Sequence, residues 1–104
     1  MKKMLWILNP HAGRGAMSGK IIGCVTEFQK AGYDVTIYIT QGSQDATRVA
    51  RERAHEFDRI VCAGGDGTLN EVVTGLMQVE DRPVLGYVPA GTTNDFASSL
   101  GISK

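Results

Sequence analysis

Short apolar runs alternate with helical patterns along this chain, and glycine-rich stretches lie between them. Residues 4–8, 60–63 and 84–88 are apolar runs, and residues 35–40 alternate apolar with polar side chains, which is the period of a β-strand. Helical spacing of apolar side chains follows each run, around residues 21–28, 46–57, 69–76 and 96–100. This alternation predicts an α/β fold of three layers, a parallel sheet with helices on both faces.

Residues near the helix ends predict where each helix starts and stops. Gly32 is a candidate C-cap for the first helix, whose buried stripe should contain Ile21, Ile22, Val25 and Phe28. Ser43 can cap the second helix. The inner face of this helix should contain Ala46, Val49, Ala50, Ala54 and Phe57. Its solvated face should contain Arg48, Arg51, Glu52 and Arg53. Thr68 and Glu71 have the spacing of a capping box, which predicts that the third helix begins at Thr68.

Length and composition narrow the class of protein. The 104 residues, 11.2 kDa, are enough for one domain with its own core. Eleven Lys and Arg balance eleven Asp and Glu, so the chain lacks the positive field that nucleic-acid binding requires. Cys24 and Cys62 lack metal-ligand spacing, which predicts buried free thiols in a reducing compartment. The apolar run at residues 4–8 is too short for a signal peptide, so we expect a cytoplasmic protein.

The loops that follow the predicted strands should meet at one edge of the sheet. Right-handed crossovers bring the carboxyl ends of parallel strands together, and open α/β proteins bind ligands there. Residues 9–15, 64–68 and 89–93 are rich in glycine and small hydroxyl side chains, so their backbone amides can approach a ligand closely. A helix N-terminus adds unpaired amides and the positive end of a dipole. This edge is predicted to bind phosphate.

Two common phosphate-binding motifs fail in the first loop. Gly13 and Gly15 begin a GxGxxG pattern, but Ser18 occupies its third glycine position and no acidic residue follows the second strand. A P-loop fails as well, because the glycine spacing is wrong and Ile21 follows Lys20 where a Ser or Thr would bind magnesium. A dinucleotide-binding dehydrogenase and a P-loop NTPase are therefore disfavoured.

The loop after the third predicted strand carries an aspartate among glycines, Gly64-Gly65-Asp66-Gly67, directly before a helix. Like charges about 4 Å apart repel by about 4 kcal/mol at an effective dielectric of about 20. A carboxylate beside phosphate therefore needs a cation or a proton donor between them, and Mg²⁺ or a substrate hydroxyl supplies one. Asp66 is a candidate to organise magnesium or to orient an attacking hydroxyl.

Three motifs, in order along the chain, resemble those of the diacylglycerol kinase catalytic-domain family, and of its soluble bacterial lipid kinases in particular. They are Asn9-Pro10-His11-Ala12-Gly13, residues 64–73 and residues 89–97. NAD kinases and phosphofructokinases share the Gly-Gly-Asp-Gly core, so an NAD kinase stays an alternative. The third motif, PAGTTNDFA, favours the lipid kinases. The resemblance implies a Rossmann-like N-terminal domain of the phosphofructokinase and NAD kinase type.

The resemblance also implies which residues bind ATP and Mg²⁺. The nucleotide contacts would be Asn9, Pro10, His11, Ala12, Gly13, Thr40, Gly65, Asp66, Gly67, Thr68, Leu69, Asn70, Glu71 and Thr92. Asp66 would be the catalytic carboxylate of an aspartate–water–magnesium network, and Asp95 would be its second metal residue, through water.

The resemblance also implies a protein of two domains. The second, β-rich domain would supply the lipid pocket, a general base and further magnesium ligands. This sequence stops at Lys104, just after the third motif, so we expect residues 1–104 to be a nucleotide-binding domain without that second domain. The chain alone should bind ATP or ADP with little or no phosphoryl transfer, and its uncovered surface should favour self-association. The lipid acceptor and peripheral membrane contact would belong to the longer protein. A non-catalytic nucleotide-binding module is the remaining alternative.

Overall fold

A computed structural model describes residues 1–9, 21–63 and 66–88 of the chain. Within these residues the chain forms a four-stranded parallel sheet in the order β2-β1-β3-β4. The strands are β1 (Lys2–Leu8), β2 (Tyr33–Ile39), β3 (Arg59–Ala63) and β4 (Val84–Val88). The helices are α1 (Ile21–Lys30), α2 (Asp45–Arg53) with the short 3-10 turn η2 (Ala54–Glu56), and α3 (Asp66–Leu76). None of these described helices is long and apolar enough to span a membrane.

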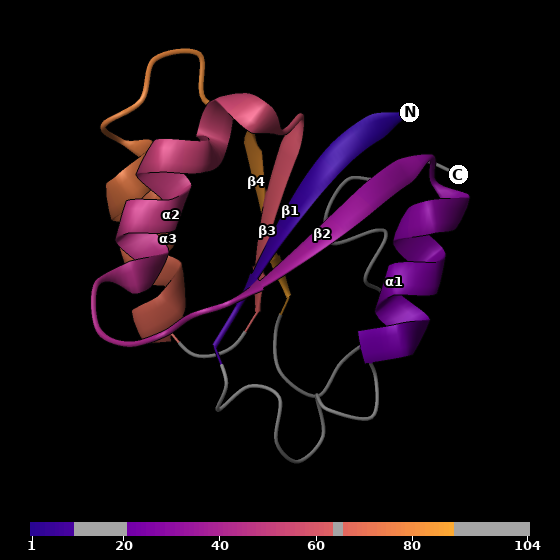
Figure 1. Ribbon diagram of the computed structural model, residues 1–104, viewed down its shortest axis with the longest axis horizontal. Helices are drawn as coiled ribbons and strands as arrows, with labels where there is room; N and C mark the ends of the chain where they lie inside the picture. The colour runs from indigo at the N-terminus through magenta and orange to yellow at the C-terminus, as the bar shows by residue number, and fades with distance from the viewer. Residues whose placement is uncertain (10–20, 64–65, 89–104) are drawn as a thin grey trace.

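Helices cover both faces of the sheet, with α1 on one side and α2 and α3 on the other (Figure 1). On the α1 side, the ring of Trp6 in β1 packs edge-on against Phe28, with 5.6 Å between the ring centroids. On the opposite side, Leu5 and Ile7 of β1 belong to the same core cluster as Val49 of α2. The predicted three-layer α/β fold is therefore confirmed, while the helix predicted around residues 96–100 lies outside the described residues.

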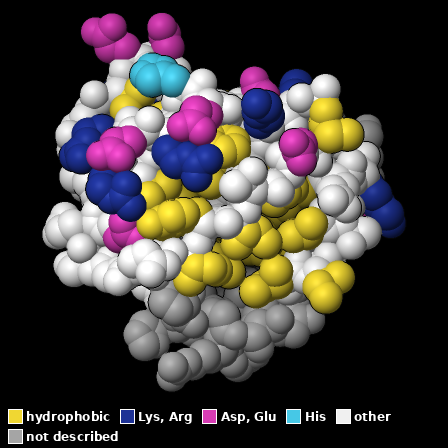
Figure 2. All heavy atoms as spheres, in the orientation of Figure 1, with side chains coloured by type: hydrophobic (Ala, Val, Ile, Leu, Met, Phe, Trp, Pro, Cys, Tyr) yellow, Lys and Arg dark blue, Asp and Glu magenta, His cyan; other side chains and the backbone are white. Residues whose placement is uncertain are grey.

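β1 and β2 differ in burial, and their sequence patterns reflect it. Residues 4–8 of β1 are at most 2% exposed, and a strand buried on both faces has a continuous apolar run. β2 is an edge strand and keeps a polar–apolar alternation. Figure 2 shows hydrophobic side chains gathered over β2, between the charged outer face of α2 and α1. Ile37 and Ile39 of this strand are 39% and 40% exposed, so β2 presents apolar surface to solvent.

The end of α1 is as predicted, but one position on its inner face is not. Gly32 has a φ of 94°, a left-handed conformation that glycine adopts without strain, and its N–H donates a hydrogen bond to the Gln29 carbonyl oxygen. Ile22 is 82% exposed, so the prediction that it faces the core is wrong. The buried position belongs to Cys24, because the stripe that faces the sheet follows the 3.6-residue period from Ile21 through Cys24.

The predicted start of α2 is wrong. Ser43 does not cap the helix, because α2 begins at Asp45 after Gln44, which has a φ of 71° and makes no side-chain cap hydrogen bond. The Asp45 carboxylate instead accepts a hydrogen bond from the backbone N–H of Gln41, which fixes the preceding loop from within the helix. The helix also ends at Arg53, and the chain continues to Phe57 through η2.

The capping box predicted at the head of α3 does not form, because the helix begins at Asp66 and Thr68 lies inside its first turn. An acidic residue at the first position is favoured by the positive end of the helix dipole. The Thr68 hydroxyl is engaged outside the helix, by the side-chain amide of Asn9. The contact with Asn9 and the dipole of α3 therefore decide how this helix begins, and the local capping pattern of Thr68 and Glu71 does not.

Both cysteines are buried thiols that form no disulfide, as predicted. Cys24 and Cys62 are 2% and 0% exposed. Burial raises the pKa of the Cys62 thiol to about 12, so the thiolate is strongly disfavoured at neutral pH. These side chains act as small apolar groups of the core.

We predict opposite effects on the free energy of unfolding for alanine substitutions at two helical glycines. A Cβ at Gly23 of α1 would meet no atom within 4 Å, so Gly23→Ala should stabilise the protein by up to about 0.5–1 kcal/mol through helix propensity. A Cβ at Gly75 of α3 would overlap the backbone of α2, so Gly75→Ala should destabilise by about 1–3 kcal/mol. Urea denaturation followed by circular dichroism measures both. Equal stabilisation by the two substitutions would contradict the close packing of α2 and α3.

Candidate functional site

The winding of the chain around the sheet reverses between β1 and β3. After β1 the chain passes through α1 on one face to β2, and after β2 it returns through α2 on the other face to β3 (Figure 1). β1 and β3 are neighbours, with Leu8 opposite Ala63 at their carboxyl ends. These two strand ends form the topological switch point, where open α/β sheets bind their ligands.

Three of the predicted site residues come together at this switch point. Asn9 follows Leu8, and its side-chain amide donates a hydrogen bond to Thr68 Oγ1 of α3, 3.4 Å away. Thr40 is tied to the same strand end, because its N–H donates to the Leu8 carbonyl oxygen at 2.9 Å. Thr40 and Thr68 are each 7% exposed. The residues that follow β1 and β2 and the start of α3 therefore lie at one place.

The first two turns of α3 carry the other described members of the predicted site. Gly67 is exposed, and a Cβ there would meet nothing within 4 Å, so its backbone is open to a ligand. Asn70 is exposed, whereas Leu69 packs against the core cluster that α2 and β3 share. The backbone carbonyl oxygen of Glu71 accepts a hydrogen bond from Thr47. The Gly67 backbone and the Asn70 side chain are thus accessible, while Leu69 and the Glu71 carbonyl anchor the helix.

The remaining predicted site residues lie wholly or partly outside the residues that the structure describes. Asp66 is the first residue of α3, and its side chain is not described. The others that lie outside the described residues are Pro10, His11, Ala12, Gly13, Gly65, Thr92 and Asp95. Within residues 1–9, 21–63 and 66–88, no group of three or more His, Cys, Asp or Glu side chains could hold a metal ion. The magnesium roles of Asp66 and Asp95 stay predictions.

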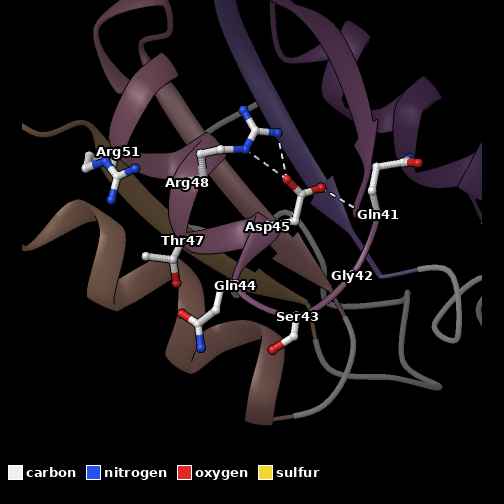
Figure 3. A pocket seen from close by; sticks show the side chains of 8 residues that line it. All are labelled: Gln41, Gly42, Ser43, Gln44, Asp45, Thr47, Arg48 and Arg51. Atoms are coloured by element: carbon white, nitrogen blue, oxygen red, sulfur yellow. Dashed lines mark hydrogen bonds and ion pairs between the residues drawn. The ribbon is translucent and has the colours of Figure 1, made fainter.

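An open pocket of about 440 Å³ lies at the start of α2, beside the loop that follows Thr40. Figure 3 shows the Arg48 side chain turned toward the Asp45 carboxylate, which also contacts the backbone of Gln41, while Thr47 points toward α3. The lining residues are Gln41, Gly42, Ser43, Gln44, Asp45, Thr47, Arg48 and Arg51. The pocket is therefore formed by the loop after β2 and the first turns of α2.

Asp45 is the centre of a polar cluster that the sequence analysis did not identify. Its Oδ2 accepts hydrogen bonds from the Tyr38 hydroxyl and the Gln41 N–H, both at 2.7 Å. Its Oδ1 accepts one from Arg48 Nη2 at 2.6 Å. The Asp45 side chain is only 11% exposed, although Arg48 belongs to the solvated face that was predicted. The one sequence signal was an acid in the first turn of a helix, three residues before an arginine.

The three ionisable groups of this cluster stabilise one another's charge states. The hydrogen bond from Tyr38, followed by those from Gln41 and Arg48, lowers the pKa of Asp45 below its ordinary value of 3.8. The same Tyr38–Asp45 hydrogen bond raises the pKa of the Tyr38 hydroxyl, and the Asp45 carboxylate raises the pKa of the Arg48 guanidinium. Around neutral pH the cluster therefore contains an ionised carboxylate, an ionised guanidinium and a protonated hydroxyl.

The sheet order and the switch point define the class of this protein, an α/β domain with a parallel sheet whose winding reverses between β1 and β3. The chain belongs to the diacylglycerol kinase catalytic domain family, whose profile matches residues 3–104. The predicted family is therefore confirmed.

Proteins named diacylglycerol kinase are similar to nearly the whole chain. The one from Bacillus subtilis (strain 168) is 47% identical over an aligned length of 105, which covers 100% of this chain and 35% of that protein. The one from Staphylococcus aureus (strain JH9) is 41% identical over 102 residues, 97% of this chain and 32% of that protein. A crystal structure of a diacylglycerol kinase from Bacillus anthracis str. Sterne matches with a TM-score of 0.76 and 39% identity, and covers 98% of this chain and 38% of that chain. The chain thus spans about a third of the length of the curated relatives it matches.

The Asp45 cluster predicts a specific pH dependence of stability. Asp45→Asn should lower the free energy of unfolding at pH 7 by about 1 kcal/mol, because the charge-assisted hydrogen bonds are lost. A folded-state pKa below 3.8 means that this contribution is complete above pH 3.8 and disappears as the pH falls through the lower, folded-state value. The difference between wild type and Asp45→Asn should therefore shrink below pH 3.8, as urea titrations at several pH values would show.

Glu52→Gln is the matched control for this prediction. Glu52 also pairs with Arg48, at 3.2 Å, but its side chain is 51% exposed. An exposed pair contributes little, so the change should cost at most about 0.5 kcal/mol at pH 7. Equal effects of the two substitutions at every pH would contradict the role of Asp45 in holding the loop.

Proposed function

We propose that residues 1–104 form the ATP-binding part of a lipid kinase, which transfers the γ-phosphoryl group of ATP to a lipid hydroxyl. The observation that carries this proposal is the Asn9–Thr68 hydrogen bond, because it joins two of the predicted nucleotide motifs at the switch point of the sheet. The diacylglycerol kinases to which the chain is similar support a lipid rather than NAD as the acceptor.

The start of α3 is the proposed phosphate-binding element. The first N–H groups of a helix have no intrahelical partner, and the dipole places a partial positive charge there. The open space beside Gly67 lets a phosphate approach these amides, and the exposed Asn70 amide can donate a hydrogen bond from the next turn. Phosphoryl transfer needs mainly correct placement and stabilisation of charge, which these groups supply without covalent chemistry.

Mg²⁺ is the proposed cofactor, held through water by Asp66 and Asp95. The donor chemistry fits, because carboxylate and water oxygens are the ligands that Mg²⁺ prefers. Bound there, Mg²⁺ would neutralise the negative charge of the ATP phosphates. Asp66 lies at the first position of α3, next to the proposed phosphate site, and is also the proposed catalytic residue.

The acceptor side of the reaction is proposed to lie in a longer protein. The curated relatives extend over about three times the length of this chain, and we propose that the additional sequence supplies the lipid pocket and the general base. A cytoplasmic location with peripheral membrane contact and self-association of the protein are further parts of the proposal. The exposed Ile37 and Ile39 are compatible with self-association.

In the intact protein, Asp66→Ala is expected to abolish ATP-dependent phosphorylation of diacylglycerol while the melting temperature stays close to that of the wild type. The reason is that the proposed carboxylate acts on the reacting groups, while its interaction with the α3 dipole contributes only about 0.3–1 kcal/mol to the fold. Transfer of radiolabelled phosphate to diacylglycerol in mixed micelles is the measurement. Asp34→Ala, an exposed aspartate near the amino end of β2, is the matched control and should retain activity.

Wild-type turnover in the Asp66→Ala protein would remove Asp66 from the mechanism. Phosphorylation of NAD in place of lipid by the intact protein would identify an NAD kinase. ATP binding by the intact protein without phosphorylation of either acceptor would favour a non-catalytic nucleotide-binding module.

Residues 1–104 alone are expected to bind ATP in the presence of Mg²⁺ without phosphorylating diacylglycerol, because the proposed base and lipid pocket lie elsewhere. Isothermal titration calorimetry measures the binding, and the micelle assay measures turnover. Diacylglycerol phosphorylation by this chain at the rate of the intact protein would contradict the proposed division of the site.

A further inference from the structure

A hydrogen bond and a close backbone contact join α2 to α3. Thr47 of α2 is 7% exposed, and its Oγ1 donates a hydrogen bond to the Glu71 carbonyl oxygen of α3 at 2.8 Å. One turn further along α3, a Cβ added to Gly75 would overlap the Thr47 carbonyl oxygen and would lie 3.0 Å from the Ala50 Cβ. α3 is therefore held against α2 by a polar contact at one level and by backbone packing at the next.

The Thr47 hydrogen bond differs from the usual bond of a threonine in a helix. A helical threonine normally donates to the carbonyl oxygen four residues earlier in its own helix, as Thr26 does to Ile22 at 2.8 Å. Thr47 donates across to another helix, to a residue 24 positions away in the sequence. It therefore fixes the position of α3 relative to α2 and adds nothing to the ladder of either helix.

The position of α3 matters because its first turns contain the proposed phosphate-binding residues. Glu71 lies one turn after Gly67 in a continuous helix, so a shift at the Glu71 carbonyl also moves the Gly67 backbone and the Asn70 side chain. The same turn of α2 holds the loop after Thr40, because Asp45 accepts the Gln41 N–H. One turn of α2 therefore sets the relative positions of two segments that are predicted to contact ATP.

We propose that Thr47 is a positioning residue for the nucleotide site. Its hydroxyl fixes the start of α3 relative to Thr40 and Asn9, and so increases the affinity for ATP without contacting the nucleotide. Figure 3 shows the Thr47 side chain directed toward α3, on the side of α2 away from the Asp45–Arg48 pair. This inference rests on the function proposed above.

The test compares Thr47→Val, which removes the hydroxyl and keeps the shape, with Thr47→Ser, which keeps the hydroxyl. Affinity for Mg²⁺-ATP is measured by titration calorimetry on the intact protein, well below the melting temperature of each variant. Thr47→Val should weaken ATP binding by about three- to tenfold and raise the KM for ATP by a similar factor, with little change in kcat. Thr47→Ser should bind ATP within about twofold of the wild type.

Thr26→Val in α1 is the matched control, because it removes a hydroxyl whose hydrogen bond stays within its own helix. It should leave the affinity for ATP unchanged. If Thr47→Val fails to fold, Thr47→Ala compared with Thr47→Ser tests the same hydroxyl.

Two results would overturn the inference while the proposed function stands. One is wild-type ATP affinity in a folded Thr47→Val protein whose stability alone has fallen, which would make Thr47 purely structural. The other is an equal loss of affinity in Thr47→Ser, which would make the methyl group responsible. A wild-type protein that binds no ATP would overturn both the proposed function and the role of Thr47.

Discussion

The burial of β1 between two parallel neighbours is the constraint on which the rest of the structure depends. Residues 4–8 have almost no exposed surface, and the strand pairs with β2 on one side and β3 on the other. The register places Leu8 opposite both Ile39 and Ala63, so the three strands end at one level. The segments that follow them must then meet at one edge, which is why Asn9, Thr40 and Thr68 lie together although they are far apart in the sequence.

The sequence was sufficient for those parts of the fold that depend on burial, and insufficient for those that depend on single tertiary contacts. Apolar runs located β1, β3 and β4, and the polar–apolar alternation located β2. The run in β1 is continuous because a central parallel strand needs apolar side chains on both faces. The capping patterns at Ser43 and Thr68 were misleading, because the Asp45 carboxylate and the Asn9 amide make contacts that a local pattern does not contain. Ile22 faces solvent because the stripe of α1 that packs on the sheet passes through Cys24, whose apolar side chain takes the buried position.

The candidate site, like the fold, could be predicted from the sequence only in part. Topology and family resemblance predicted that the residues after β1 and β2 would meet the start of α3, and the hydrogen bonds of Asn9 and Thr40 agree with this. Asp45 and Thr47 could not be predicted, because each supports the site from a helix that carries no motif. Their importance depends on which backbone group lies opposite them, and the partner of Thr47 is 24 residues away in the sequence.

The charge balance of the chain explains why such supporting contacts matter for the proposed site. Eleven positive and eleven negative side chains give no net field to attract a polyanion. The two arginines beside the pocket are already paired, Arg48 with Asp45 at 2.6 Å and Arg51 with Glu52 at 3.6 Å. Among the groups that the structure describes at the proposed site, the amides at the start of α3 are placed to attract phosphate, and their effect falls off within about one turn of helix. Such short-range groups act only when the helix is correctly placed, so ATP affinity should depend more on the packing of α2 against α3 than on the number of surface charges.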